Sequence, residues 1–311
     1  MASLFEIGKS GVQAYRQALS VTGQNIANVN TEGYNKRAAD LEEVPSVQGG
    51  VTNVPDQSGL GVRVNQIRRS FDAFLASNLR DTNGEQQKLD GFVDKLNKLE
   101  NMLLPGDSDL GTFIGRFFSS LQDVASRPDE LSARTVALES GKALANSFNT
   151  YDNQLKNFKS TSHNEVKDNL KVVNSLVDQL AQVNKLIMSG GSKNSSPDVL
   201  DARDNLLLDL SKFINFTVDY GEKNDAIVKL GNSGNGKILL EKTNKSTLLS
   251  EIQEDRLIFK MSRNAINTTI NDISAGLIGG IRDFFNFVGE VQKEINELAN
   301  RLSKDFNEIQ Q

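Results

Sequence analysis

Apolar residues recur every three or four positions from about residue 3 to residue 28, which is the spacing of one face of an α-helix. One stripe of this predicted helix consists of Leu4, Ile7, Gly11, Ala14, Ala18 and Val21. A second stripe beside it consists of Phe5, Val12, Tyr15, Leu19 and Ile26. Gly and Ala along the first stripe suit the close approach of another helix. Because an isolated helix is marginal in water, we expect this one to need a partner, although an ordinary core helix fits the same pattern.

Residues 38–69 change character, with two prolines, four glycines and short alternations such as Val62 and Val64. Such a stretch predicts an extended arm with one or two edge strands. Ser70 then has the chemistry of a helix N-cap, and Asp72 would lie in the first turn, where a negative charge is favoured.

The next part of the chain is predicted to be largely helical as far as Met188. Its first heptad pattern consists of Leu89, Phe92, Leu96, Leu99 and Leu103. Pro105-Gly106 ends this helix, and a short amphipathic helix is predicted over residues 110–125. A later pattern consists of Val166, Val173, Leu176, Leu180, Val183 and Ile187. Another helix is expected to begin at Ser196-Pro197.

Residues 214–263 alternate with a period of two between Gly-Asn and Lys-Asn turns, which predicts four or five antiparallel strands. A heptad pattern returns from Ile281 and consists of Phe284, Val288, Val291, Ile295, Leu298 and Leu302. The predicted fold is therefore mainly α, with a long helical bundle or coiled-coil body, an extended N-terminal arm and a small antiparallel β subdomain. The expected domains are an axial helix and arm (1–69), a helical bundle (70–213), a β subdomain (214–270) and a return helix on the bundle (271–311).

Composition narrows the classes of function. The chain has 311 residues, no cysteine and a net charge of −5, so disulfides and thiolate metal sites are excluded. The charge is spread along the chain, and no basic patch predicts nucleic-acid binding. No window approaches the roughly 18 consecutive apolar residues of a membrane span, and the first residues lack the apolar core of a cleaved secretory signal.

Catalytic chemistry is poorly supported. The single histidine, His163, lies among polar residues and is predicted to be a solvated helix position. The glycine-rich stretch 231–237 continues into a strand-like run, so a hairpin turn fits it better than a phosphate-binding loop. The acidic residues Glu42-Glu43 and Asp201–Asp204 are expected to be solvated charge, and Asp107-Ser-Asp109 is expected to cap a helix. The sequence therefore predicts no enzyme, no cofactor and no metal site.

The stretch GQNIANVNTEGYNKR, residues 23–37, has a different composition, with four asparagines and one tyrosine. Asparagine tolerates left-handed backbone, and its amide can satisfy free backbone groups at a helix end. Gly33 can take a positive φ, and Tyr34 can pack its ring while its hydroxyl donates to a neighbour. The residues alone predict a rigid exit from the first helix.

ANVNTEGYNKR, preceded by a helix of the form S-G-x-x-A-x-x-x-A-L, resembles the N-terminal signature of the bacterial flagellar axial proteins, the rod, hook and hook-associated family. Three further stretches resemble the hook-associated members: GLGVRVNQIRRSFDAFLASNLRD, SPDVLDARDNLLLDLSKFINFTV and AGLIGGIRDF. The resemblance covers most of the chain. The family ends in a C-terminal helix that pairs with the N-terminal one, so we expect this chain to be C-terminally truncated.

The resemblance implies a structural subunit of the bacterial flagellum that joins hook to filament. Expected partners are other copies of the chain, the hook protein, the next hook-associated protein toward the filament, the flagellar type III export apparatus and an export chaperone, with no nucleic acid. The expected location is the extracellular flagellum, reached without a cleaved signal. The alternatives are a hook or rod axial subunit, or a soluble helical binding module such as a secretion chaperone.

The resemblance also assigns roles to residues. The axial family motif, expected to hold the junction between the first helix and the arm, consists of Asn25, Asn28, Asn30, Thr31, Gly33 and Tyr34. The expected subunit interface consists of Leu4, Ile7, Gly11, Ala14, Ala18, Val21 and Val62. The expected packing positions of the helical body are Leu89, Phe92, Leu96, Leu99, Leu103, Val288, Ile295 and Leu302.

Overall fold

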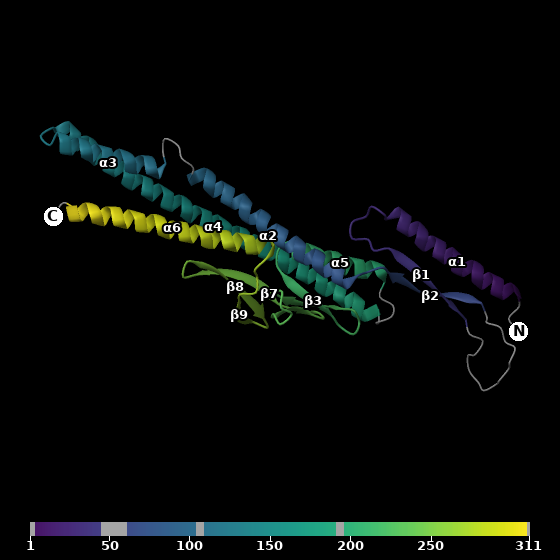
Figure 1. The fold of residues 1–311 in the computed structure, drawn as a ribbon. Helices are drawn as coiled ribbons and strands as arrows, with labels where there is room; N and C mark the ends of the chain where they lie inside the picture. Colours follow the sequence, from purple (N-terminus) through teal and green to yellow (C-terminus); the bar gives the residue numbers. More distant parts are fainter. Residues whose placement is uncertain (1–3, 45–60, 104–108, 191–195, 310–311) are drawn as a thin grey trace.

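The protein is mainly α-helical and elongated, as its computed structural model shows (Figure 1). The structure describes residues 4–44, 61–103, 109–190 and 196–309. The helices in these ranges are α1 (Leu4–Ala27), α2 (Ala73–Leu103), α3 (Leu110–Ser126), α4 (Leu131–Gly190), α5 (Pro197–Ser211) and α6 (Gly276–Ile309). None of the described helices is long and apolar enough to cross a membrane. The predicted mainly α fold is confirmed.

The N-terminal unit, which we define as α1, β1 (Arg37–Glu43) and β2 (Val62–Arg69), lies at one end of the molecule (Figure 1). The two strands form an antiparallel ribbon that pairs Arg37 with Arg69. Helix α1 packs on this ribbon through its Gly- and Ala-containing stripe, in which Ala14 and Val21 are only 4% and 3% exposed. These two residues were predicted to contact neighbouring subunits. That prediction is wrong for them, because their own chain buries them.

The long body consists of α2, α3, α4 and α6 (Figure 1). Helix α4 has 60 residues and is therefore about 90 Å long at 1.5 Å per residue. Helices α2, α4 and α6 share an apolar cluster of Leu99, Leu155, Phe284 and Val288. Helix α3 packs on α4 and reaches α6 through the rings of Phe117 and Phe306, whose centroids are 5.7 Å apart.

The predicted packing positions of the body differ in how deeply they are buried. Leu99 and Val288 are buried, while Phe92, Leu103 and Ile295 pack at the edge of the same cluster. Leu96 and Leu302 are partly buried. The prediction is wrong for Leu89, which is 59% exposed because it lies on the side of α2 turned away from α6.

The β region contains seven described strands, where the sequence predicted four or five. They form a four-stranded sheet, β3 (Phe216–Tyr220), β4 (Ala226–Leu230), β5 (Ile238–Glu241) and β6 (Asn244–Lys245), and a three-stranded sheet, β7 (Thr247–Gln253), β8 (Arg256–Arg263) and β9 (Ile266–Ile270). The prediction missed β9 because Asn264 and Ala265 form a tight turn with positive φ that carries no glycine. The inner faces of both sheets, the second half of α4, α5 and the start of α6 enclose the largest apolar core.

Helix ends also differ from the sequence reading. Asp72 caps α2, because its Oδ1 accepts from the backbone N–H groups of Phe74 and Leu75, so Ser70 is not the cap. Helix α6 begins at Gly276, five residues before the first heptad position, Ile281. Asp109 caps α3 as predicted, whereas Asp107 lies outside the described residues.

Candidate functional site

Asn25 closes the end of α1 onto the first strand. Its side-chain amide donates to the carbonyl of Arg37 at 2.8 Å, and its Oδ1 accepts from the backbone N–H of Arg37 at 2.9 Å. The hydroxyl of Tyr34 donates to the same Oδ1 at 2.9 Å. One asparagine thus takes the place of a neighbouring strand for residue 37, which fixes the direction in which the chain leaves α1.

The turn between α1 and β1 is built by two further motif residues. Asn28 donates from its amide to the carbonyl of Gln24 and accepts the hydroxyl of Thr31 at 3.2 Å. Tyr34 donates its backbone N–H to the carbonyl of Thr31. Asn30 differs from its predicted partners, since it is exposed and makes no hydrogen bond to any described residue.

Gly33 is required at the point where this turn meets α5. Its φ is +75°, and a Cβ placed there would lie 1.8 Å from Oδ1 of Asn205. Any other residue would therefore strain the backbone and displace the side chain of Asn205. This close approach brings the N-terminal unit against the body at a contact region that we call the joint.

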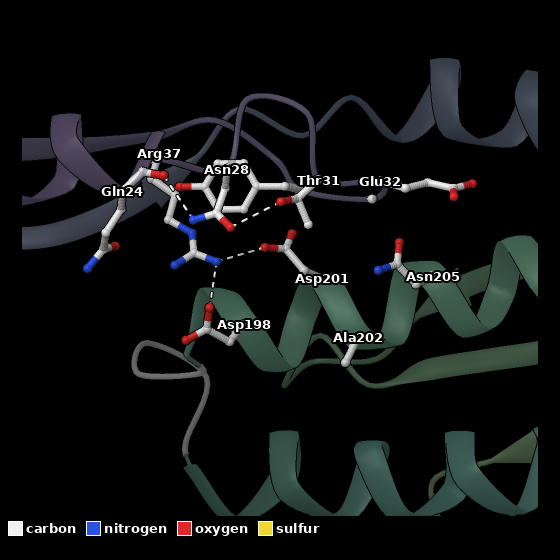
Figure 2. Close-up of a pocket in the computed structure, with 11 residues that line it drawn as sticks. Gln24, Asn28, Thr31, Glu32, Arg37, Asp198, Asp201, Ala202 and Asn205 are labelled. Carbon is white, nitrogen blue, oxygen red and sulfur yellow. Dashed lines mark hydrogen bonds and ion pairs between the residues drawn. The ribbon is translucent and has the colours of Figure 1, made fainter. Parts of the chain in front are cut away.

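Ion pairs between strand ends and α5 hold the joint together. Figure 2 shows Arg37 directed at two carboxylates of α5, with Nη2 at 2.6 Å from Asp198 and 2.9 Å from Asp201. Arg69, its partner across the ribbon, places Nε 2.9 Å from Asp201 Oδ1 and Nη2 2.5 Å from Asp204. Asp201 also accepts from Asn35 at 2.8 Å. Asp201 thus receives three contacts from the N-terminal unit.

The exposure of each side chain determines how much its ion pair contributes to the stability of the joint. The side chains of Arg69, Asp201 and Asp204 are 5%, 10% and 10% exposed, whereas Asp198 is 74% exposed. The sequence reading of residues 201–204 as solvated charge is therefore wrong for Asp201 and Asp204. Buried ions need complete pairing, so removal of one partner leaves an uncompensated charge. Asp198 faces water and contributes little.

Arg203 extends the network from α5 into the β region. It contacts Asp204 through Nε at 2.8 Å and donates from Nη1 to the carbonyl of Asn224 at 2.6 Å. Its guanidinium lies 4.4 Å from the ring centroid of Tyr220, which is a cation–π contact. Burial raises the pKa of Tyr220, so its hydroxyl stays protonated. Arg69, Asp204 and Arg203 therefore form a continuous ion network that links the ribbon of β1 and β2 to α5 and to the β region.

The guanidinium of Arg37 also lies 4.8 Å from the ring centroid of Tyr34. Burial by itself lowers the pKa of Arg37, but its hydrogen bonds to Asp201 and Asp198 outweigh this, so the pKa lies above its ordinary value. Arg37 is therefore a permanent cation at any pH at which the protein is folded.

A cleft of about 480 Å³ opens beside these groups, between the motif turn and α5 (Figure 2). It is lined largely by polar side chains, and among them Arg37 bonds Asp198 and Asp201 across the joint. Among the described ranges, no group of three His, Cys, Asp or Glu residues could hold a metal ion. The arrangement fixes an angle between two parts of the molecule.

His163 lies elsewhere, on α4 beside β7. The prediction of a solvated position is wrong, because Nε2 is buried and has no hydrogen-bond partner among the described residues. Burial, and then the charge of Lys167, hold the pKa of His163 below its ordinary value. The half-buried imidazole also bonds the backbone of Ser250 and packs α4 against β7.

Sequence reasoning found the asparagine motif but missed the ion network. One signal for it was present in the sequence. Asp198, Asp201 and Asp204 are three residues apart, so they share one face of a helix. The two basic partners, Arg37 and Arg69, are joined only by the strand register, which the sequence did not fix.

Comparison with known proteins matches two parts of the chain to protein families. Residues 96–311 match the family described as flagellar hook-associated protein FlgK helical domain. Residues 5–35, which include the asparagine motif, match flagella basal body rod protein.

Several flagellar hook-associated proteins 1 are similar to the chain. That of Bacillus subtilis is 27% identical over 98% of this chain and 66% of its own length. That of Salmonella typhimurium is 29% identical over 70% of this chain and 39% of its own length. The flagellar hook junction protein FlgK from Burkholderia pseudomallei has a similar fold, with a TM-score of 0.60 and 22% identity over 67% of this chain and 38% of that one. This chain thus spans between about two fifths and two thirds of the length of these relatives.

Proposed function

Because the chain belongs to the flagellar hook-associated protein FlgK family, we propose that it is a structural subunit of the bacterial flagellum that joins hook to filament. The observation that carries this proposal is the joint. The rod-protein family matches residues 5–35, which include the asparagine motif and nearly all of α1. The helical-domain family matches residues 96–311, which include most of the body. The ion pairs between Arg37, Arg69 and α5 fix the angle between these two parts. A tube-forming adaptor needs such a fixed angle, since an error at each subunit accumulates around the ring.

We propose that the outer stripe of α1 contacts other copies of the chain. Seven large apolar side chains on or just after α1 are between 62% and 87% exposed: Leu4, Phe5, Val12, Tyr15, Leu19, Ile26 and Val29. Exposed apolar area of this extent on one helix is typical of an interaction site. Burying each large side chain contributes roughly 1.5–3 kcal/mol, which is enough to order α1 within an assembly. Of the predicted interface residues, Leu4 belongs to this outer stripe. Ile7, Gly11, Ala18 and Val62 lie partly buried between α1 and the ribbon, beside the buried Ala14 and Val21.

The remaining partners follow from the same proposal. They are the hook protein on one side, the next hook-associated protein on the other, and the type III export apparatus with an export chaperone during assembly. The location would be the extracellular flagellum, reached without a cleaved signal. The proposed units are an axial helix and arm (1–69), a bundle (70–213), a β subdomain (214–270) and a return helix (271–311).

Deletion of the gene tests the proposal. We expect cells with hooks but without filaments, and flagellin monomers lost to the medium. Complementation with the intact gene should restore filaments. Normal filaments in the deletion strain would rule out the adaptor role.

A second test separates the interface from the fold. The change Leu19→Ser in the outer stripe should lower filament number in the complemented strain while leaving the thermal stability of the purified protein unchanged. Gln17→Ser, an exposed polar position on the same helix, is the matched control and should restore filaments fully. Equal complementation by both variants would contradict the assignment of this stripe.

The match of residues 5–35 to a rod protein keeps a hook or rod subunit as the second candidate. Immunogold labelling of isolated hook–basal bodies distinguishes the two. Label confined to the distal end of the hook supports the adaptor, and label along the hook or rod supports the alternative.

A further inference from the structure

The dipeptide Asn-Gly occurs twice in the chain, at residues 83–84 and 235–236. The two copies have the same local chemistry but lie in different structures. Residues 83–84 are inside α2, and residues 235–236 are in the connection between β4 and β5. We propose that Asn235 is a site of spontaneous chain modification, in which its amide is lost through a cyclic imide, and that the fold protects Asn83 from the same reaction.

The reaction joins two groups of adjacent residues. The backbone nitrogen of Gly236 gives up its proton and attacks Cγ of Asn235, and the side-chain nitrogen leaves as ammonia. The new bond closes a five-membered succinimide ring. Water then opens the ring at one of its two carbonyls. Opening at the side-chain carbonyl gives aspartate, and opening at the backbone carbonyl gives isoaspartate, whose main chain runs through Cβ.

The β4–β5 connection leaves both reacting groups free. Asn235 is exposed, and neither its side chain nor the N–H of Gly236 has a hydrogen-bond partner among the described residues. Residues 231–237 form no regular ladder. The peptide between Asn235 and Gly236 lies outside the ladder, so its nitrogen can turn toward Cγ of Asn235 through local opening at Gly236 without breaking a hydrogen bond of its own to any described residue.

Packing explains why glycine occupies position 236. A Cβ there would lie 1.6 Å from the carbonyl oxygen of Leu230, so the connection accepts no side chain. Glycine is also the residue that hinders attack by its own nitrogen least, because it has no Cβ and the widest range of backbone angles. The close approach that the fold requires at Gly236 thus exposes Asn235 to the reaction.

Asn83 is held away from the same reaction. Its side-chain amide donates to Oγ of Ser211 at 3.1 Å, and Gly84 is buried against α5. Within α2 the N–H of Gly84 is committed to the carbonyl four residues earlier, and ψ of Asn83 is fixed in the helical range. Attack there requires local unfolding of α2.

Trypsin provides a direct comparison, because it releases each Asn-Gly in a peptide of its own, residues 81–88 and residues 230–237. The purified full chain is incubated folded in mildly alkaline buffer made with oxygen-18 water, then digested and examined by tandem mass spectrometry. We expect peptide 230–237 to gain the amide-to-acid mass and the heavy oxygen at Asn235 at least about tenfold faster than peptide 81–88, a ratio that corresponds to about 1.4 kcal/mol of local opening. Comparable rates in the folded chain would overturn the proposal.

Two further measurements isolate the cause. In urea, where α2 is absent, both peptides should react at similar rates. A persistent preference for 230–237 would show that neighbouring sequence, and not the fold, selects the site. Asn235→Ser should abolish the mass gain in peptide 230–237, whereas Asn232→Ser in the same peptide should leave it. A gain that survives Asn235→Ser would refute the assignment.

Discussion

The change Asp201→Asn tests whether charge holds the N-terminal unit on the body. Asparagine keeps the size and one acceptor oxygen of Asp201, but it removes the negative charge that faces Arg37 and Arg69. The two arginines stay beside α5 with Asp198 and Asp204 as their remaining carboxylates. The perturbation is therefore electrostatic and confined to the joint.

The expected magnitude follows from burial and geometry. A hydrogen bond to a charged group contributes about 1.5–3 kcal/mol, and breaking a buried pair costs about 3–5 kcal/mol. Nε of Arg69 faces Asp201 at 2.9 Å without the alignment of a hydrogen bond, and Asp204 still neutralises Arg69, so the lower part of this range applies. We expect docking of the N-terminal unit to weaken by about 2–4 kcal/mol, which raises the undocked population roughly 30- to 1,000-fold.

The chain has no cysteine, so two can be introduced as spin-label sites without background. Gln17→Cys on α1 and Gln182→Cys on α4 are both exposed. The distance distribution between them should be narrow in the parent and broad in Asp201→Asn. Asp209→Asn on the same helix removes an exposed pair with Lys212 and should leave the distribution narrow. An unchanged distribution in Asp201→Asn would refute the view that this carboxylate holds the joint.

Three other expectations concern stability. Gly33→Ala should lower the free energy of unfolding by about 1–3 kcal/mol, because position 33 has a positive φ and the new Cβ would contact Asn205; the loss should appear as a lower Tm. Adding Asn205→Ala to this variant should recover only the part of the loss that comes from the steric contact. Phe284→Ala should cost about 3–5 kcal/mol in denaturant unfolding, and a loss below about 1 kcal/mol would contradict its place in the core. The folded-state pKa of His163 lies below its ordinary 6.5, so stability should fall as pH drops through 6.5 toward the folded pKa, and His163→Gln should flatten that dependence.

Local patterns predicted the helices well because their causes are local. The periodic apolar positions of α1 and α3, the N-cap Asp109 and the end of α4 near Gly190 follow from residues close to one another in the chain. The exit turn at Asn25 and Asn28 was predicted for the same reason, since its hydrogen bonds span at most twelve residues.

Predictions that depended on distant partners failed. Ala14 and Val21 carry the signature of a close helix contact, but a two-stranded ribbon of the same chain fills that role. Leu89 follows the heptad pattern and is still exposed, because the position of α6 decides which side of α2 is inside. Asp201 reads as surface charge until β1 and β2 place two arginines over it.

The sequence by itself determined the mainly α body, the apolar faces of its helices and the amide-rich turn after α1, because backbone hydrogen bonds and periodic burial act over a few residues. Tertiary structure alone decided which stripe of α1 is covered, that Arg37 and Arg69 meet the same carboxylate, and that one Asn-Gly is locked in a helix while the other is free. Those outcomes depend on contacts between residues distant in the chain, from 52 positions for Ser10 with Val62 to 164 positions for Arg37 with Asp201. A local sequence pattern does not specify which distant residues will meet.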